Sequence, residues 1–321
     1  MRLRRLDVVE RQAGRNTITE WRTPHGTLQK LFRLTSDLAT YGVRGLEVEY
    51  RIKSAADYAA AHYRLEHTDV VPTHEHFAIE PHAVGEDGPN MPDTACVPFH
   101  AFLRECAGYE HWYYELNDHP AQVKQFLAAP ADQLASIQQI ALDSAAHVLR
   151  FEGNYDSRLT PPPIFDRFFL PVALAYAERA HARGKLLCTH TDEDETLLHS
   201  RILACGFDVA EAFTPPPMTS AGIADARADW GERIAIWGGI ASTMLSAWVP
   251  EADFEAHMVN LFHEAAPGRK FLLGTGDNVP TDADFQRVHR ITRIVEECGR
   301  FPIDPARLPP RPKAVAAPLP R

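Results

Sequence analysis

The feature that most constrains the fold is a series of five short apolar runs, each of which ends abruptly in polar residues. They begin at residues 147, 185, 208, 233 and 270, so successive starts lie 38, 23, 25 and 37 residues apart. A strand, a helix and two short loops need about this much chain. The rhythm therefore predicts five consecutive βα units and, with a less regular first half, an α/β fold of the (β/α)₈ TIM-barrel type.

The N-terminal part of the chain predicts a β-hairpin in front of these units. Residues 21–34 read as this N-terminal hairpin, with Pro24, His25 and Gly26 in the turn. The Pro-rich C-terminus has little apolar surface to bury. We therefore expect three segments, namely an N-terminal extension, a single barrel domain and a Pro-rich tail, over residues 1–20, 21–300 and 301–321.

Charge and cysteine content exclude several classes of protein. The formal net charge is −10, with 43 acidic residues against 33 basic ones. Nucleic acids and anionic membranes are bound by clustered positive charge, so neither is an expected partner. The five cysteines are scattered without a CxxC pair, which indicates reduced thiols. With no apolar run of signal-peptide or membrane-span length, we expect a cytoplasmic protein.

The run at residues 185–190 leads into the most informative polar stretch, in which His190 is followed by Asp192, Glu193 and Asp194. In extended chain the side chains of His190 and Asp192 point the same way, because they lie two residues apart. An imidazole beside a carboxylate can bind a divalent metal or act as a base with its orienting group. The alternative is a helix N-cap with an acidic first turn, which explains the acids but not His190.

Polar residues at the ends of the other runs should line the same opening, because parallel strands end on one face. Glu211, Asp156 and Glu152 are candidate catalytic acids. For Glu211 the alternative is a buried acid satisfied by backbone groups, and for Asp156 it is a helix cap. Two further histidines would share one face of an earlier strand. The candidate substrate-binding residues are thus Asn154, Trp237, Asn278, His74 and His76.

Several segments resemble the uroporphyrinogen decarboxylase-like superfamily, which includes corrinoid-linked methyltransferases. They read IFDRFFLPVALAYAERAHARGKLLCTH, GFDVAEAF, DARADWGERIAIWGGI and LLGTGDNVPTDADFQRVHRI. The string TPHGTL is similar to a hairpin on the methyltransferase side of the superfamily. The likeness covers most of residues 21–299, and it implies a TIM barrel.

The decarboxylase branch of the superfamily fits less well. Its RQAGR motif carries arginines that hold substrate carboxylates, and the same string occurs here at residues 11–15. Here it precedes the hairpin and continues as NTITEW, without the usual aromatic residue. A porphyrin with several carboxylates also needs a basic cleft, whereas the strand ends of this chain are acidic. The resemblance is therefore closer to the methyltransferase branch.

The resemblance to the methyltransferases implies a metal site. Their zinc ligands are a His-x-Cys pair after one strand and a distant cysteine at the closing strand. His190 and Asp192 match the pair with an aspartate in place of cysteine, and Asp277 falls where the second cysteine would lie. One histidine and two carboxylates still suit Zn²⁺ and also admit Mn²⁺ or Fe²⁺. The alternative is that both positions have drifted and no metal is retained.

The function implied is that of a metal-dependent methyltransferase or demethylase. It would act on a small O-methyl compound and pass the methyl group to a corrinoid protein. The alternative is a metal-assisted lyase or decarboxylase acting on a small carboxylic acid without corrinoid. A non-catalytic ligand-binding barrel is a third reading, which the cost of unpaired buried carboxylates disfavours. The expected partners are a small-molecule substrate, a corrinoid protein and a second copy of the chain in a homodimer.

Overall fold

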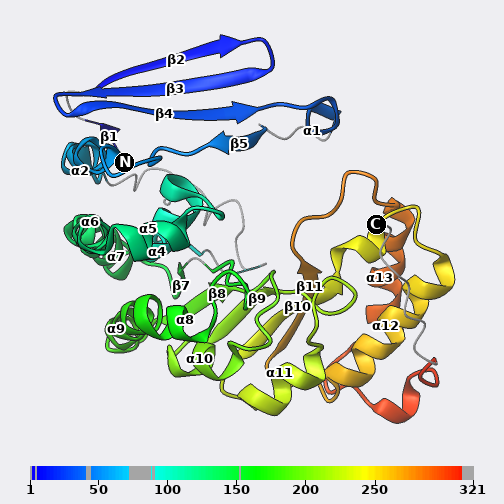
Figure 1. The fold of residues 1–321 in the computed structure, drawn as a ribbon. Coiled ribbons are helices and arrows are strands. Elements are labelled where there is room, and N and C mark those ends of the chain that lie inside the picture. The colour runs from blue at the N-terminus through cyan, green and yellow to red at the C-terminus, as the bar shows by residue number, and fades with distance from the viewer. Residues whose placement is uncertain are drawn as a thin grey trace. The chain divides into compact units, whose positions relative to one another are not determined.

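A computed structural model describes residues 2–3, 6–40, 45–71, 88, 91–151 and 153–312, and the chain forms two compact units (Figure 1). The first unit comprises Met1–Asn90 and Thr94–Ala145, and the second comprises Met91–Asp93 and Ala146–Arg321. None of the helices in these described ranges is long and apolar enough to cross a membrane. The single barrel domain over residues 21–300 stays a prediction.

The first unit is built on an antiparallel sheet in the order β2-β3-β4-β5. These strands cover Asp7–Ala13, Asn16–Thr23, Gly26–Arg33 and Leu46–Glu49. The predicted hairpin is seen in part as β3 and β4: Gly26 belongs to β4 and not to the turn, and β3 begins at Asn16, before the predicted start at residue 21. Strand β2 lies within the stretch that we expected to be an extension. Its side chains are almost all exposed, so it pairs through its backbone without an apolar pattern in the sequence.

Helices make up most of the rest of this unit. The aromatic side chains of Tyr58, Phe102 and Phe126 meet in its core, with ring centroids 6.1 Å apart for Tyr58 and Phe126 and 5.8 Å apart for Phe102 and Phe126. A short pair of strands, β1 (Arg2–Leu3) and β6 (Thr68–Asp69), is antiparallel. The helical elements are α1 (Ser36–Thr40), α2 (Asp57–Glu66), α4 (Pro98–Ala101), the π-helix η1 (Phe102–Ala107), α5 (Trp112–Asp118), α6 (Pro120–Ala128) and α7 (Ala131–Asp143).

The second unit contains a five-stranded parallel sheet in the order β11-β10-β9-β8-β7. Each of the five apolar runs of the sequence supplies one strand, so the prediction of five consecutive βα units is confirmed. Strands that are consecutive in the chain are neighbours in the sheet, which is how strands are arranged in one wall of a TIM barrel. The strands are β7 (Val148–Phe151), β8 (Leu186–His190), β9 (Val209–Phe213), β10 (Ala235–Ala241) and β11 (Phe271–Gly276).

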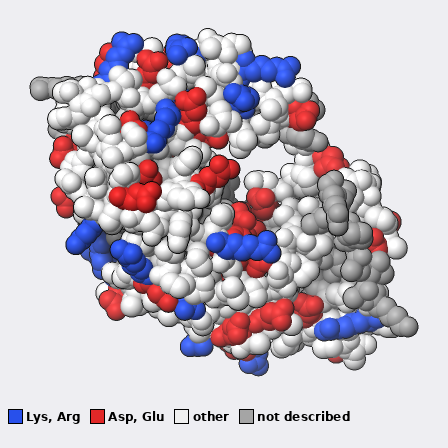
Figure 2. All heavy atoms as spheres, in the orientation of Figure 1, with Lys and Arg blue, Asp and Glu red and all other residues white. Residues whose placement is uncertain are grey.

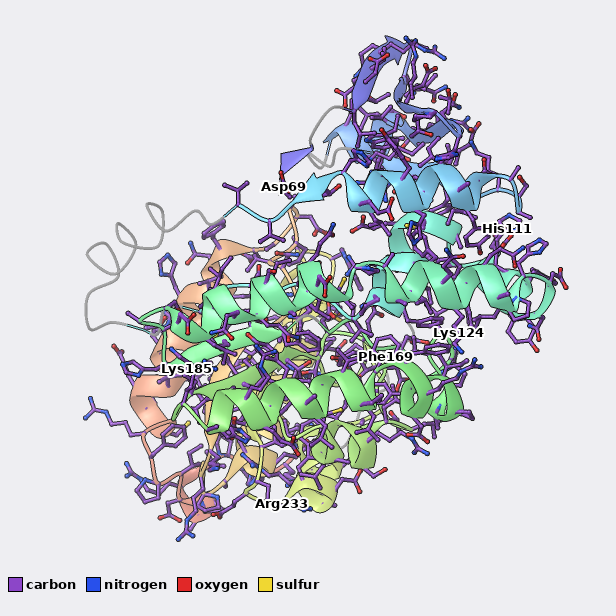
Figure 3. All side chains as sticks on the ribbon, turned by 90° about the vertical axis from the view of Figure 1, so that its left-hand side faces the viewer. Asp69, His111, Lys124, Phe169, Lys185 and Arg233 are labelled. Carbon is purple, nitrogen blue, oxygen red and sulfur yellow. The ribbon has the colours of Figure 1, made fainter. Side chains whose placement is uncertain are left out.

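Helices follow each strand and pack on one side of this sheet (Figure 1). Phe169, labelled in Figure 3, lies between α8 and α9, where its ring stacks on that of Phe165 with centroids 5.2 Å apart. The helices are α8 (Pro162–Phe168), α9 (Leu170–His181), α10 (His199–Ala204), α11 (Ile223–Trp230), α12 (Glu251–Ala265) and α13 (Phe285–Cys298), with short 3₁₀ turns at Ser242–Leu245 and Pro305–Arg307.

The two faces of the parallel sheet differ in burial. Leu149, Leu187, Ala210 and Ile236 are fully buried, and together they form the core beneath the helices. Their neighbours along the strands point the other way, because successive side chains of a strand alternate. This second set is partly exposed, and it consists of Arg150, His190, Glu211, Trp237 and Leu272. Polar groups on this face are therefore available for a site.

The predicted closed (β/α)₈ barrel is not seen within the described residues. Five parallel strands form an open sheet, extended at the β7 edge only by a bridge between Asp93 and Arg150. The physical reason is that the first part of the chain commits its strands elsewhere. Leu46–Glu49 pairs antiparallel with β4, and residues 98–143 are mainly helical. The fold shown is thus α/β with a parallel five-stranded sheet.

Candidate active site

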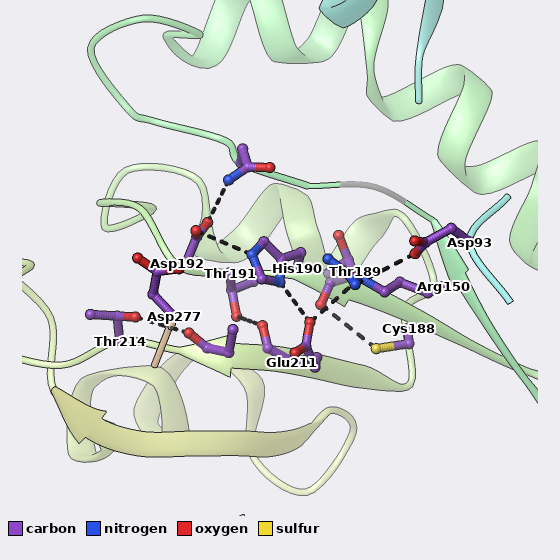
Figure 4. Close-up of polar contacts among 12 residues, drawn as sticks. Asp93, Arg150, Cys188, Thr189, His190, Thr191, Asp192, Glu211, Thr214 and Asp277 are labelled. Carbon is purple, nitrogen blue, oxygen red and sulfur yellow. Dashed lines mark hydrogen bonds and ion pairs between the residues drawn. The ribbon is translucent and has the colours of Figure 1, made fainter. Parts of the chain in front are cut away.

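His190, the last residue of β8, is held between two carboxylates (Figure 4). Its Nδ1 lies 2.6 Å from Oε2 of Glu211, which is on the adjacent strand β9. Its Nε2 lies 3.1 Å from Oδ2 of Asp192. The register explains the first contact, because His190 and Glu211 are direct neighbours across β8 and β9. The sequence spacing of two residues explains the second.

Both carboxylates are held in turn by other groups. Asn154, in the loop after β7, donates from Nδ2 to Oδ1 of Asp192 at 2.8 Å. Arg150 of β7 places its Nε 3.6 Å from Oε2 of Glu211 and its Nη1 3.5 Å from Oδ1 of Asp93. A continuous series of charged and polar groups therefore crosses the sheet, in the order Asp93, Arg150, Glu211, His190, Asp192 and Asn154.

The environment of His190 favours its protonated form. Burial alone would lower the pKa of the imidazole, but hydrogen bonds and charge interactions with Asp192 and Glu211 outweigh it and raise the pKa to about 9. Each carboxylate stabilises the imidazolium at a different ring nitrogen. In the metal-free protein at neutral pH, His190 is therefore a cation that donates a proton to each acid.

This raised pKa predicts how stability depends on pH. In the unfolded chain a histidine has a pKa near ~6.5, so the stabilising effect is complete below that pH and is lost as the pH rises through about 9. We expect the free energy of unfolding of metal-free protein to fall by on the order of 2–3 kcal/mol between pH 6 and pH 10. Urea titrations with EDTA present would measure it. His190→Gln should show a flatter profile, and an unchanged profile would contradict the prediction.

A cavity of about 430 Å³ lies beside this series in the second unit. Its lining includes Asp192, Asp277, which follows β11, and Asp156, in the loop after β7. Residues far apart in the sequence thus meet at the carboxyl edge of the sheet. The side chain of Asp277 is exposed, and its Oδ1 accepts a hydrogen bond from Nδ2 of Asn278 at 2.9 Å. The structure therefore brings Asp192, Asp277 and Asp156 around one cavity.

Two of the three predicted metal ligands, His190 and Asp192, are in direct contact with each other. A separation of 3.1 Å between His190 Nε2 and Asp192 Oδ2 is a normal spacing for two ligands of one ion at ~2.0–2.2 Å. The contact of Nδ1 with Glu211 is the usual partner contact of a metal-bound histidine. Across the described ranges, however, no three His, Cys, Asp or Glu side chains are already grouped as a metal site. Asp277 must turn from Asn278 to become the third ligand.

The other predicted site residues have different surroundings. Trp237 of β10 is the register partner of Glu211 of β9. Its indole ring packs closely on Gly274 of β11, because a Cβ added to this glycine would lie 3.0 Å from the indole Nε1. Asn278 is exposed beside Asp277. Oδ1 of Asp156 accepts hydrogen bonds from the backbone N–H groups of Arg158 and Leu159, so it caps a turn and not α8. Three further predicted residues lie outside the described residues, namely Glu152, His74 and His76.

The N-cap interpretation of the acidic stretch is wrong. Residues 191–198 form a loop, and α10 begins only at His199. The loop instead buries Glu195, whose side chain is 4% exposed. Burial and the nearby charge of Asp192 raise the pKa of the Glu195 carboxyl well above its usual range. The stretch is therefore a site loop with a buried acid near Asp192.

Sequence reasoning missed Arg150, which links Glu211 to Asp93. The signal was present in the sequence, because Arg150 is the only charged residue in the run at residues 148–151. A charge within an otherwise apolar strand needs a partner. Here the partner, Glu211, is on β9, which β8 separates from β7. That pairing depends on the order of the strands, which a single sequence does not contain.

Together, the parallel sheet and the polar groups at its carboxyl edge define an α/β protein with its candidate site where enzymes of this class have theirs. The chain belongs to the uroporphyrinogen decarboxylase family, because the family model described as uroporphyrinogen decarboxylase (URO-D) matches residues 98–298, more than half of the chain.

Solved structures support the same fold. One similar structure is a methyltransferase from Methanosarcina mazei, with a TM-score of 0.53 and 14% sequence identity over 68% of this chain. The match covers 61% of that methyltransferase, so the chain spans about three fifths of its length. No curated protein sequence matches the chain significantly.

Proposed function

We propose that this chain is a methyltransferase that removes a methyl group from a small O-methyl compound and passes it to a corrinoid protein. The observation that carries the proposal is the contact of His190 Nε2 with Asp192 Oδ2 at 3.1 Å, beside a cavity that Asp277 also lines. Membership of the family and the fold likeness to a methyltransferase support it. All three residues occupy the positions that the resemblance implies for zinc ligands.

In this proposal a divalent metal, zinc in the first instance, is held by His190, Asp192 and Asp277. When bound, it supplies Lewis acidity to an oxygen of the substrate. The chain's own residues set up the site. Glu211 keeps the Nδ1 proton of His190 in place and so directs Nε2 toward Asp192, and Arg150 holds Glu211. Asp156 lies on the wall of the same cavity, and in this proposal it contacts the bound substrate.

A metal-binding measurement tests the proposal first. His190→Ala should weaken zinc binding by about 100-fold or more and abolish methyl transfer to a corrinoid protein, because two protein ligands remain. His181→Ala is the matched control, since His181 Nε2 also lies 2.8 Å from a carboxylate, that of Asp208, but sits on α9 away from the cavity. Unchanged zinc affinity in His190→Ala would contradict the metal site.

A second candidate function rests on the protonation of His190. An imidazolium with a pKa of about 9 can donate its Nε2 proton to a substrate, as a lyase or decarboxylase acting on a small carboxylic acid requires. The two functions differ in their substrates and in whether they need a corrinoid protein. Turnover of a free acid without corrinoid protein would favour the second, whereas methyl transfer that depends on corrinoid would favour the first.

A further inference from the structure

Three cationic side chains of the first unit surround one indole ring. Trp21 lies on β3 and is only 5% exposed. The guanidinium carbons of Arg51 and Arg64 lie 5.1 Å and 5.2 Å from the centre of this ring, and Nζ of Lys30 lies 5.8 Å from it. The negative face of an indole attracts each cation, but the cations also repel one another. Three positive charges are therefore gathered around a buried ring.

Only one of these three cations is ion-paired within the part of the chain that the structure describes. Nη1 of Arg51 lies 3.2 Å from Oε2 of Glu105 and 3.8 Å from Sγ of Cys106. The side chains of Arg64 and Lys30 are half-buried, and neither makes a hydrogen bond or an ion pair in the described ranges. The Nε atoms of both arginines are buried without a hydrogen-bond partner. Donors that are left unsatisfied in this way are costly.

The electrostatics of the cluster also leave positive charge uncompensated. Burial, and after it the charge of Arg51, lowers the pKa of Lys30 and that of Arg64. Glu47 of β5 attracts Lys30 and Arg51, but burial raises the pKa of its own carboxyl. Its Oε1 is buried and accepts no hydrogen bond. Glu47 therefore does not supply the acceptors that the cations lack.

We propose that Lys30, Arg51 and Arg64 form a binding site for a small oxyanion, namely the phosphate or carboxylate group of a ligand. A guanidinium presents its N–H groups in a planar fork that fits two oxygens of either group, and an ammonium adds a compact charge. Lys30 lies on β4 and Arg64 on α2, so a bound oxyanion would join the sheet to this helix. All three residues belong to the first unit, and the site goes beyond the proposed methyl transfer.

Binding of inorganic phosphate and of acetate to purified full-length protein tests this site. Calorimetric titrations at constant ionic strength would measure both affinities, and the tighter of the two anions identifies the group that the site takes. Arg64→Gln and Lys30→Gln each remove one unpaired cation. We expect each change to weaken binding of the preferred anion by about 10- to 100-fold, because a hydrogen bond to a charged group is lost.

The matched control is Arg22→Gln, which changes the net charge equally on the same strand as Trp21. Arg22 is exposed, and its Nη1 lies 3.4 Å from Oδ2 of Asp7, so its replacement should leave both affinities unchanged. Wild-type protein that binds neither anion would overturn the site. An equal loss in all three variants, or no loss in Arg64→Gln and Lys30→Gln, would do the same.

Urea unfolding gives a second readout of the oxyanion site. A ligand that binds only folded protein raises its stability, so the preferred anion should raise the urea midpoint of wild type and of Arg22→Gln. It should have little effect on Arg64→Gln and Lys30→Gln. Circular dichroism would confirm that each variant is folded, and Lys30→Gln decides the question if Arg64→Gln is not.

Discussion

Gly153→Ala is expected to lower the free energy of unfolding by about 4 kcal/mol or more, because the added methyl group has no space. A Cβ on Gly153 would lie 1.8 Å from the carbonyl oxygen of His190 and 2.7 Å from its carbonyl carbon. Both are backbone atoms at the end of β8, a strand that is paired on both sides by β7 and β9. The variant must therefore displace the loop at residues 153–157 or distort β8.

Either displacement would also separate Asn154 from Asp192. Urea unfolding would measure the loss of stability. Gly184→Ala is the matched control, because Gly184 has a φ of 68° but no heavy atom within 4 Å of an added Cβ. That change should cost only about 1–2 kcal/mol, from the left-handed backbone. If Gly153→Ala were no less stable than this control, the close packing against His190 would be refuted.

The strands of the parallel sheet could be predicted because each has a clear boundary in the sequence. His190 stands where an apolar run ends and is the last residue of β8, whereas Glu211 is the middle residue of the neighbouring strand β9. The contact between His190 and Asp192 could also be predicted, because a spacing of two residues puts both side chains on one side of extended chain. Local periodicity was sufficient for these features.

Contacts between strands could not be predicted in the same way. The pairing of Arg150 with Glu211 joins residues on β7 and β9, and it requires both the strand order and the register. The side chain of Asp277 shows the same limit. Its position after β11 places it at the expected edge, but its φ of 80° and its contact with Asn278 are set by the local loop. The sequence position of Asp277 therefore predicts that it lies at the carboxyl edge of the sheet, but it does not predict how close its side chain comes to His190 and Asp192.

The N-terminal sheet was only partly predictable for another reason. Strand β2 is an edge strand whose side chains are nearly all exposed, so its sequence lacks the alternation that marks a half-buried strand. Strands β3 and β4 bury Trp21 and Leu28, and the turn residues between them predict this part of the sheet. Both acidic and basic side chains appear on the face shown in Figure 2, and several of the acidic ones lie side by side.

Arg287→Ala is expected to destabilise the second unit by about 3–5 kcal/mol, because it would leave buried carbonyl groups without a donor. Arg287 lies on α13, and its side chain is 4% exposed. Its Nη1 donates to the carbonyls of Met244 at 2.7 Å and Ser246 at 2.8 Å, and its Nη2 donates to that of Val249. The guanidinium therefore joins the segment between β10 and α12 to α13 through hydrogen bonds.

Urea unfolding of purified variants would measure the loss. Arg287→Lys keeps the positive charge but cannot reach three carbonyls with one planar group, so it should recover only part of the stability. Arg293→Ala, at an exposed position of the same helix, is the matched control and should change the free energy of unfolding by less than ~0.5 kcal/mol. A loss no larger than that of Arg293→Ala would show that these carbonyls find other donors.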